Sequence, residues 1–188
     1  MNLQKMFEMQ KALDERIIKE KGLEGQDLLP NLILALQVEL AECANEWRGF
    51  KHWSNDREPR TKHPLEVSPN GAFRKGGNPL LEEYVDCLHF ILSIGNRIGF
   101  NNDATIQQII KRSKEREVET NIGIGKAFSH LMSLVFGFYF SIEDEGTYVR
   151  SFERFLNLGQ QLGFTPEQIE AAYMEKNAVN HQRQQEGY

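Results

Sequence analysis

The sequence of 188 residues is 40% hydrophobic and 26% charged, which is typical of a globular chain with one core, and we expect a single domain over residues 1–188. Its net charge of −5 argues against direct nucleic-acid binding, which requires concentrated Lys and Arg. The first residues do not resemble a signal peptide, and the longest apolar stretch, residues 131–142, is too short to cross a bilayer. These features predict a cytoplasmic protein without a membrane partner, in which Cys43 and Cys87 are reduced packing residues.

The apolar spacing predicts an all-α fold, a bundle of about six to seven helices with no strands. The first helix covers residues 3–19 and carries Gln10 in the middle of its apolar stripe. The second follows Pro30 and ends near residue 48. The third begins after Pro79 and runs to about residue 98, where Gly99 supplies a stop.

A long segment rich in proline, glycine and basic residues, residues 50–78, separates the second and third helices, and we expect residues 55–78 to be an insertion. Irregular segments of this length in compact domains are often functional lids or disordered stretches. A solvated, mobile insertion is the alternative. Four further helices are expected over residues 103–119, 122–140, 148–162 and 166–185, with an acidic turn at residues 143–146 and Thr165 as the cap of the last helix.

Two pairs of carboxylates border the apolar faces of the second and third helices. Glu39 and Glu42 lie three residues apart, as do Glu83 and Asp86, so each pair shares one helical face. An ionised carboxylate beside a core is costly unless it is paired or coordinated. A solvated acidic face is the ordinary alternative for one such pair. Two pairs in equivalent positions favour a cation site.

Polar residues near the two ends of the chain fit a nucleotide. In the last helix, Tyr173, Asn177 and Asn180 share a face, with Lys176 and Arg183 beside it. Amides match the donors and acceptors of a base, and cations neutralise phosphate oxygens. An exposed, solubilising helix is the alternative. Gln10 needs a partner for its amide, either a backbone group or a ligand.

A short cluster directly after the second helix contains Lys51, His52 and Trp53. The first two side chains are candidates for phosphate contacts, and the indole of Trp53 is a candidate for stacking on a base. Packing within the protein is the alternative interpretation of the tryptophan.

Taken together, these motifs resemble the dimeric all-α dUTP pyrophosphatases, a branch of the all-α nucleotide pyrophosphohydrolases. The similarity covers most of the chain apart from the central insertion. It is carried by MFEMQKAL around Gln10, by VELAECANE followed by FKHWS, by EEYVDCLHFILSIG, and by the ending YMEKNAVNHQRQQEGY. The carboxylate pairs would fit any member of the wider superfamily, whereas the KHWS cluster and the ending are more specific.

The resemblance implies a dUTP diphosphatase that releases dUMP and pyrophosphate and also accepts dUDP. It implies that Glu39, Glu42, Glu83 and Asp86 hold Mg²⁺, with Mn²⁺ as an alternative, and we assign Glu42 the further role of orienting the attacking water. It also implies a homodimer. The residues expected to bind substrate are Gln10, Lys51, His52, Trp53, Phe90, Tyr173, Lys176, Asn177, Asn180, Arg183 and Tyr188.

Within that set, the resemblance implies that Gln10, Trp53 and Asn180 recognise the base and that Phe90 packs against the sugar. The phosphates would be held by Lys176, Asn177, Arg183 and Tyr188.

Three other interpretations remain open from the sequence. A related pyrophosphohydrolase for dCTP or modified nucleotides would share the metal acids. A di-iron bundle would use Asp86 and His89, although the second helix lacks a histidine at position 42. A helical interaction protein is the third, because phage-borne members of the family bind repressor proteins and the basic insertion offers such a surface.

Overall fold

The computed structural model describes residues 1–68, 71–74, 76–115, 123–138, 140–141 and 144–187. Seven α-helices account for most of these described residues, so the expected all-α bundle is confirmed. The helices are α1 (Leu3–Glu20), α2 (Leu29–Trp47), α3 (Pro79–Ile98), α4 (Asp103–Glu115), α5 (Ile124–Phe138), α6 (Glu145–Gln161) and α7 (Pro166–Gln185).

Capping residues explain why several helices begin and end where they do. Asn78 caps α3 by accepting a hydrogen bond from the Leu81 amide, and Gly99 ends that helix with a φ of 78°. Thr165 and Gln168 form a reciprocal capping box at the start of α7. The α6 helix starts earlier than expected, at Glu145, because Asp144 caps it. The expected acidic turn therefore belongs partly to this helix, and residues 142 and 143 lie outside the described residues.

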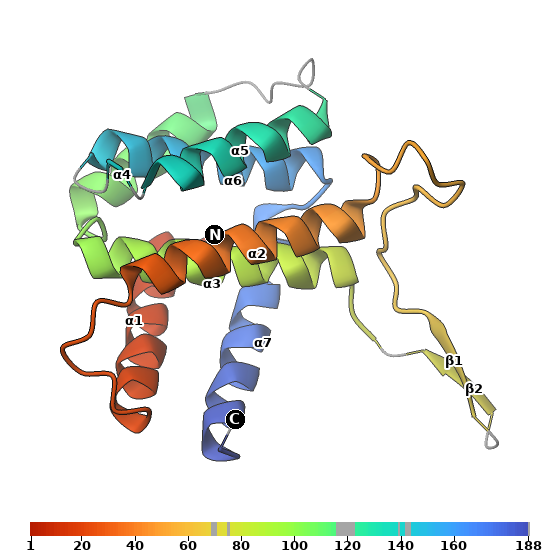
Figure 1. Ribbon diagram of the computed structural model, residues 1–188, viewed down its shortest axis with the longest axis horizontal. Coiled ribbons are helices and arrows are strands. Elements are labelled where there is room, and N and C mark those ends of the chain that lie inside the picture. The colour runs from red at the N-terminus through yellow and green to blue at the C-terminus, as the bar shows by residue number, and fades with distance from the viewer. Residues whose placement is uncertain (69–70, 75, 116–122, 139, 142–143, 188) are drawn as a thin grey trace.

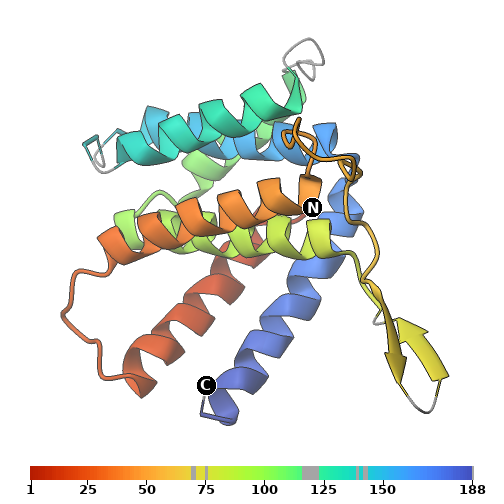
Figure 2. The same cartoon turned by 45° about the vertical axis from the view of Figure 1, so that its right-hand side comes forward.

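The helices form three layers (Figure 1). The α2 and α3 helices run antiparallel in the middle layer, with α4, α5 and α6 on one side and α1 and α7 on the other (Figure 2). The core follows this arrangement, since the α2 residues Leu36 and Leu40 and the α3 residues Leu88 and Leu92 are completely buried. Cys43 and Cys87 are buried and free in the same layer, as expected. None of the helices in the described residues combines the length and apolar character that a membrane span needs.

Two tyrosines fix the central helix α3 against α6. The Tyr84 ring stacks on Phe155 with centroids 4.2 Å apart, and its hydroxyl donates to the Phe155 carbonyl at 3.0 Å. The Tyr148 hydroxyl donates to the Ile91 carbonyl at 3.0 Å. Close approach is made possible by Gly95, where an added Cβ would lie 2.1 Å from the Tyr148 hydroxyl. The packing of α3 is thus specified on the face opposite its carboxylates.

The segment between α2 and α3 contains a short antiparallel hairpin, which the sequence patterns did not predict. Strand β1 (Leu65–Ser68) pairs with β2 (Gly71–Arg74), with Leu65 opposite Arg74. Among the described residues, neither strand packs against a helix. The base of the segment is tied to α2, because Arg48 forms an ion pair with Asp56 at 3.0 Å and the Arg60 amide donates to the Glu46 carbonyl. Residues 69, 70 and 75 of the expected insertion lie outside the described residues.

Candidate active site

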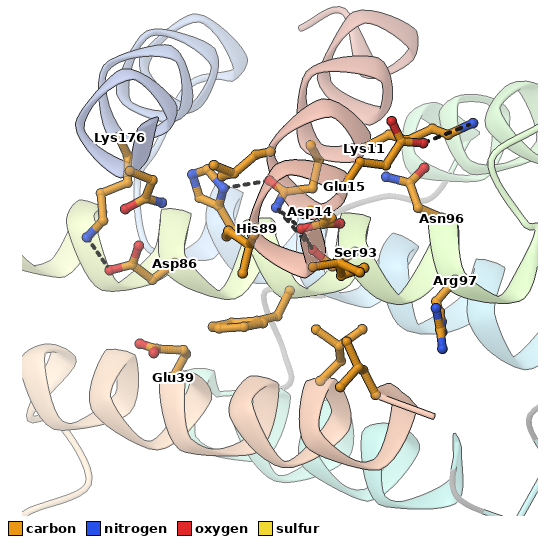
Figure 3. Close-up of a pocket in the computed structure, with 18 of the residues that line it drawn as sticks. Lys11, Asp14, Glu15, Glu39, Asp86, His89, Ser93, Asn96, Arg97 and Lys176 are labelled. Atoms are coloured by element: carbon orange, nitrogen blue, oxygen red, sulfur yellow. Dashed lines mark hydrogen bonds and ion pairs between the residues drawn. The ribbon is translucent and has the colours of Figure 1, made fainter. Parts of the chain in front are cut away.

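Three carboxylates from two helices meet where α2 and α3 face each other. Glu39 of α2 and Glu83 and Asp86 of α3 offer ligand oxygens that all lie within 4.8 Å of one another. Figure 3 shows Glu39 facing Asp86 across the space between the two helices. All three side chains are half-buried. Oxygen donors grouped in this way suit a hard divalent cation such as Mg²⁺.

Burial and mutual repulsion make this cluster costly to ionise. Burial, followed by the charges of Asp86 and Glu42, raises the pKa of Glu39 to about 7 and the pKa of Glu83 to about 7. Burial also raises the pKa of Asp86, although Lys176 opposes that shift. Glu42 is exposed beside these acids, one turn along α2 from Glu39. A bound cation would offset this repulsion, so the chemistry of these donors fits a metal.

Helix α7 places a cation directly against the acids. The Lys176 ammonium lies 2.5 Å from Asp86 Oδ2, and the dashed line in Figure 3 marks this ion pair. Both side chains are partly buried, with relative exposures of 23% and 19%. The pairing joins the C-terminal helix to the carboxylate cluster.

A pocket of about 540 Å³ opens beside the cluster, between α1, α2, α3 and α7. This volume is in the range of small-molecule sites. Glu39, Asp86 and Lys176 lie at one end, Lys11, Glu15, Asn96 and Arg97 lie toward the other end, and apolar side chains complete the lining (Figure 3). Residues from the four helices line it, among them Gln10, Asp14, Ile17, Leu32, Glu39, Asp86, His89, Phe90, Ser93, Lys176, Asn180 and Arg183.

A buried hydrogen-bond network forms one wall of the pocket. Gln10 Nε2 donates to Asp14 Oδ1 at 2.9 Å and to Ser93 Oγ at 3.0 Å, while Ser93 Oγ donates to the same Asp14 oxygen at 2.9 Å. Gln10 Oε1 lies 2.6 Å from His89 Nδ1 and 3.1 Å from the Tyr173 hydroxyl. Figure 3 shows His89, Asp14 and Ser93 gathered around the α1 helix. Burial, opposed by the hydrogen bonds from Gln10 and Ser93, raises the pKa of Asp14 to about 6.

The surroundings of His89 determine its charge and the position of its ring proton. Burial, reinforced by the nearby Lys176 charge, lowers the pKa of His89 to about 3, so the ring is neutral at physiological pH. Because Gln10 Oε1 only accepts, the proton lies on Nδ1 and Nε2 carries a lone pair. Among the described residues, Nε2 has no hydrogen-bond partner. His89 faces Gln10 and is not a member of the carboxylate cluster. A di-iron bundle would need this histidine among the metal ligands.

A family model described as dUTPase matches residues 2–67 and 71–188. The chain belongs to the all-α dimeric dUTPase family. It is accordingly a dUTP diphosphatase, a hydrolase of nucleotide metabolism. A comparison with curated proteins gave no match.

The dUTPase pocket brings together many, but not all, of the residues expected from the sequence. Tyr173 and Asn177 are buried beneath the pocket rather than lining it, and the Tyr173 hydroxyl also contacts the Met6 carbonyl at 3.1 Å. Glu83 belongs to the carboxylate cluster beside the pocket. The expected residues that line it are Gln10, Glu39, Asp86, Phe90, Lys176, Asn180 and Arg183.

The KHWS cluster lies apart from this pocket of the dUTPase chain. Lys51 reaches the Asn45 side chain, and His52 packs edge-on against Trp53 with centroids 4.9 Å apart. Trp53 is 68% exposed and also contacts Phe50. None of the three expected residues, Lys51, His52 and Trp53, lines the pocket. Tyr188 lies outside the described residues.

The sequence patterns did not identify the polar residues that contact Gln10 in the pocket wall, nor the lining residues Lys11, Glu15, Asn96 and Arg97. Asp14, Ser93 and His89 connect to Gln10, yet only His89 had been considered, and then as an iron ligand. One signal was available, because Gln10 and Asp14 lie four residues apart on one helical face. Ser93 comes from another helix, so its contact depends on tertiary packing.

Proposed function

We propose that this dUTPase hydrolyses dUTP, and also dUDP, in a reaction that depends on Mg²⁺, and that it cleaves dUTP between the α and β phosphates. The observation that carries this proposal is that one pocket combines a charged cluster with groups that suit a base and a sugar. The carboxylate cluster and Lys176 form a charged end suited to phosphates and cations. His89, Phe90 and Asn180 line the same pocket and suit a base and sugar.

At the charged end, Glu39, Glu83 and Asp86, assisted by Glu42, would hold the cations. Bound Mg²⁺ neutralises phosphate charge and lowers the pKa of a bound water. Glu42 is the most exposed of these acids and is therefore available to accept a proton from the attacking water. Lys176 is partly buried, which strengthens its attraction to a phosphate.

Elsewhere in the same pocket, the buried Nε2 of His89 would accept a hydrogen bond from the N3–H group of uracil. Asn180 offers both a donor and an acceptor to the remaining base edge. Phe90 would pack against the deoxyribose, where its apolar ring disfavours a 2′-hydroxyl. Trp53 remains a candidate for stacking on the base and would have to approach it from outside the pocket lining.

Apolar side chains on the outer faces of α2 and α5 support a homodimer. Leu34 and Val38 follow each other by one turn of α2 and are 61% and 46% exposed, and Phe136 of α5 is 59% exposed. The α2 and α5 helices pack against each other, so these side chains lie on neighbouring elements. We propose that a second copy of the chain covers them.

The decisive experiment measures pyrophosphate release from dUTP, dCTP, dTTP and UTP, each with Mg²⁺, with Mn²⁺ and with EDTA. We expect the largest kcat/KM for dUTP, and no turnover with EDTA. Inorganic pyrophosphate should be the co-product, whereas stepwise release of phosphate would contradict cleavage between α and β. Faster turnover of dCTP than of dUTP would contradict the proposal and would indicate a pyrophosphohydrolase for cytidine nucleotides.

A further inference from the structure

Gln10 makes hydrogen bonds through both its amide nitrogen and its amide oxygen inside the protein. Its amide nitrogen reaches Asp14 and Ser93, and its amide oxygen lies within hydrogen-bonding distance of His89 and the Tyr173 hydroxyl. A glutamine side chain has two N–H donors and two oxygen lone pairs, and the single hydroxyl proton of Tyr173 is shared between Gln10 Oε1 and the Met6 carbonyl, each at 3.1 Å. The side chain is also only 3% exposed. Gln10 is therefore placed to orient its neighbours, and direct contact with a base would require it to give up an existing bond.

Among the groups in direct contact with the Gln10 amide, one fixes its orientation. Ser93, His89 and Tyr173 each carry groups that donate or accept, so each is compatible with either orientation of the amide. The Asp14 carboxylate only accepts. It takes one hydrogen bond from Gln10 Nε2 and the hydroxyl proton of Ser93, both on Oδ1. With its proton committed to Asp14, Ser93 Oγ is left as an acceptor for the second N–H of Gln10.

We propose that Asp14 is a positioning residue that sets the pyrimidine preference of the enzyme by fixing the Gln10 amide and, through it, the tautomer of His89. Each hydrogen bond in this chain has a defined direction. The Asp14 carboxylate accepts from a Gln10 N–H group, and Gln10 Oε1 accepts from the Nδ1–H of His89. The Nε2 atom of His89 is left with a lone pair. The inference rests on the proposed function, in which His89 meets the base.

The lone pair on His89 Nε2 distinguishes uracil from cytosine, two bases of nearly equal size. Uracil carries a hydrogen on N3 and would donate it to His89 Nε2, whereas cytosine has a lone pair at that atom. Two facing acceptors leave both unsatisfied in a buried site, which costs binding. Without Asp14, the Gln10 amide is free to turn over and to donate to His89 Nδ1. The proton of His89 would then lie on Nε2, where it matches cytosine.

The test compares Asp14→Ala with Asp14→Asn, which keeps an acceptor oxygen at the same place. Glu8→Ala, an exposed acid on the same helix, is the matched control. We expect Asp14→Ala to lower the ratio of kcat/KM for dUTP over dCTP by about tenfold or more, since buried polar mismatches discriminate strongly. Asp14→Asn should keep the ratio within about threefold of the wild type, and Glu8→Ala should leave it unchanged.

A ratio that stays at the wild-type value in folded Asp14→Ala would overturn the inference, and so would an equal loss in both Asp14 variants. A measurement on the wild-type protein covers the case in which Asp14→Ala fails to fold. Long-range ¹H–¹⁵N spectra of the histidine rings should place the His89 proton on Nδ1, and a proton on Nε2 would refute the proposal. If the wild type itself fails to prefer dUTP over dCTP, the proposed function is wrong, whereas the spectrum still reports on the network.

Discussion

At the scale of single residues, the proposed chemistry rests on the four carboxylates, and Glu42 differs from the others in its exposure. Replacing Glu42 with Gln removes the group proposed to accept the proton from water but preserves its size. We expect kcat for dUTP to fall by about 10²–10⁴-fold, the usual contribution of a general base, with an unchanged circular dichroism spectrum. Glu175→Gln, an exposed change on α7, is the control. Full activity of the Glu42 variant would remove this residue from the mechanism.

The half-buried acids also predict how pH and metal affect the stability of the protein. Glu39 and Glu83 have an ordinary pKa of 4.5, and in the folded protein without a cation each has a pKa of about 7. Between these values the folded state holds more protons than the unfolded state, so stability falls as pH rises through this window.

In thermal unfolding with EDTA, we therefore expect the Tm to fall as pH rises from about 5 to about 7, because the raised pKa values of Glu39, Glu83 and Asp14 together outweigh the opposite effect of the lowered pKa of His89. Added Mg²⁺ should raise the Tm more at the upper end of this range, because the ionised acids bind the cation. Glu39→Gln should flatten the profile. A Tm with EDTA that is constant across the window would contradict the proposed cost of these charges.

The sequence predicted residues on one helical face more readily than contacts between helices. Glu39, Glu83 and Asp86 were found by their three-residue spacing on apolar helices, and the structure brings them within 4.8 Å. Asp14 and Ser93 meet through Gln10 only because α1 packs on α3, and no spacing in the sequence encodes that meeting. Contacts of this kind follow from tertiary packing.

At the scale of helices and strands, α3 depends on close contact with α6 at Gly95. An Ala side chain there would place its Cβ 2.1 Å from the Tyr148 hydroxyl and 2.9 Å from the Phe7 ring. We expect Gly95→Ala to lower the free energy of unfolding by about 1–3 kcal/mol, measured in urea. Gly137 in α5 has nothing within 4 Å of an added Cβ, so Gly137→Ala should stabilise by about 0.5–1 kcal/mol. A change of the same sign in the free energy of unfolding of both variants would contradict this explanation.

The role of the hairpin between α2 and α3 can be tested by shortening it. Leu65 and Arg74 are paired, so residues 66–73 can be replaced by two glycines without moving the ends apart. The ties of Arg48 to Asp56 and of Arg60 to Glu46 remain in this variant. We expect kcat/KM for dUTP within about twofold of the wild type, since surface loops tolerate such changes.

Retained activity would leave partner binding, for example to a repressor protein, as the role to test for this surface. A large rise in KM would instead identify the hairpin as a lid.

Strand prediction failed in this segment for a physical reason. Each strand has four residues, and proline and glycine flank or interrupt the pair, so there is too little alternation to reveal a period of two. Helix boundaries were predicted closely where a cap was recognisable. Thr165 and Pro166 mark the start of α7, and Gly99 marks the end of α3. The start of α6 was missed because the acidic residues before it were interpreted as a turn, although Asp144 is its cap.

At the scale of the whole molecule, a substitution on the outer face of α2 tests the proposed dimer. The chain has a mass of 21.7 kDa, and we expect light scattering after size exclusion to give twice that mass. A charge in an apolar interface is costly, so Val38→Lys should shift the mass toward one chain. Leu65→Lys, on the exposed hairpin, is the control. An unchanged mass for Val38→Lys would exclude this face as the dimer contact.

The pocket takes its walls from both ends of the chain, so its lining is completed only when the last helix has been synthesised. Gln10 belongs to the first helix, Lys176 and Asn180 belong to the last, and the terminal amine pairs with Glu170 of α7 at 3.3 Å. A ribosome that has translated six helices has already made all the carboxylates but not the helix that completes the pocket. A polypeptide that stops before α7 therefore lacks Lys176, Asn180 and Arg183, and with them one wall of this pocket.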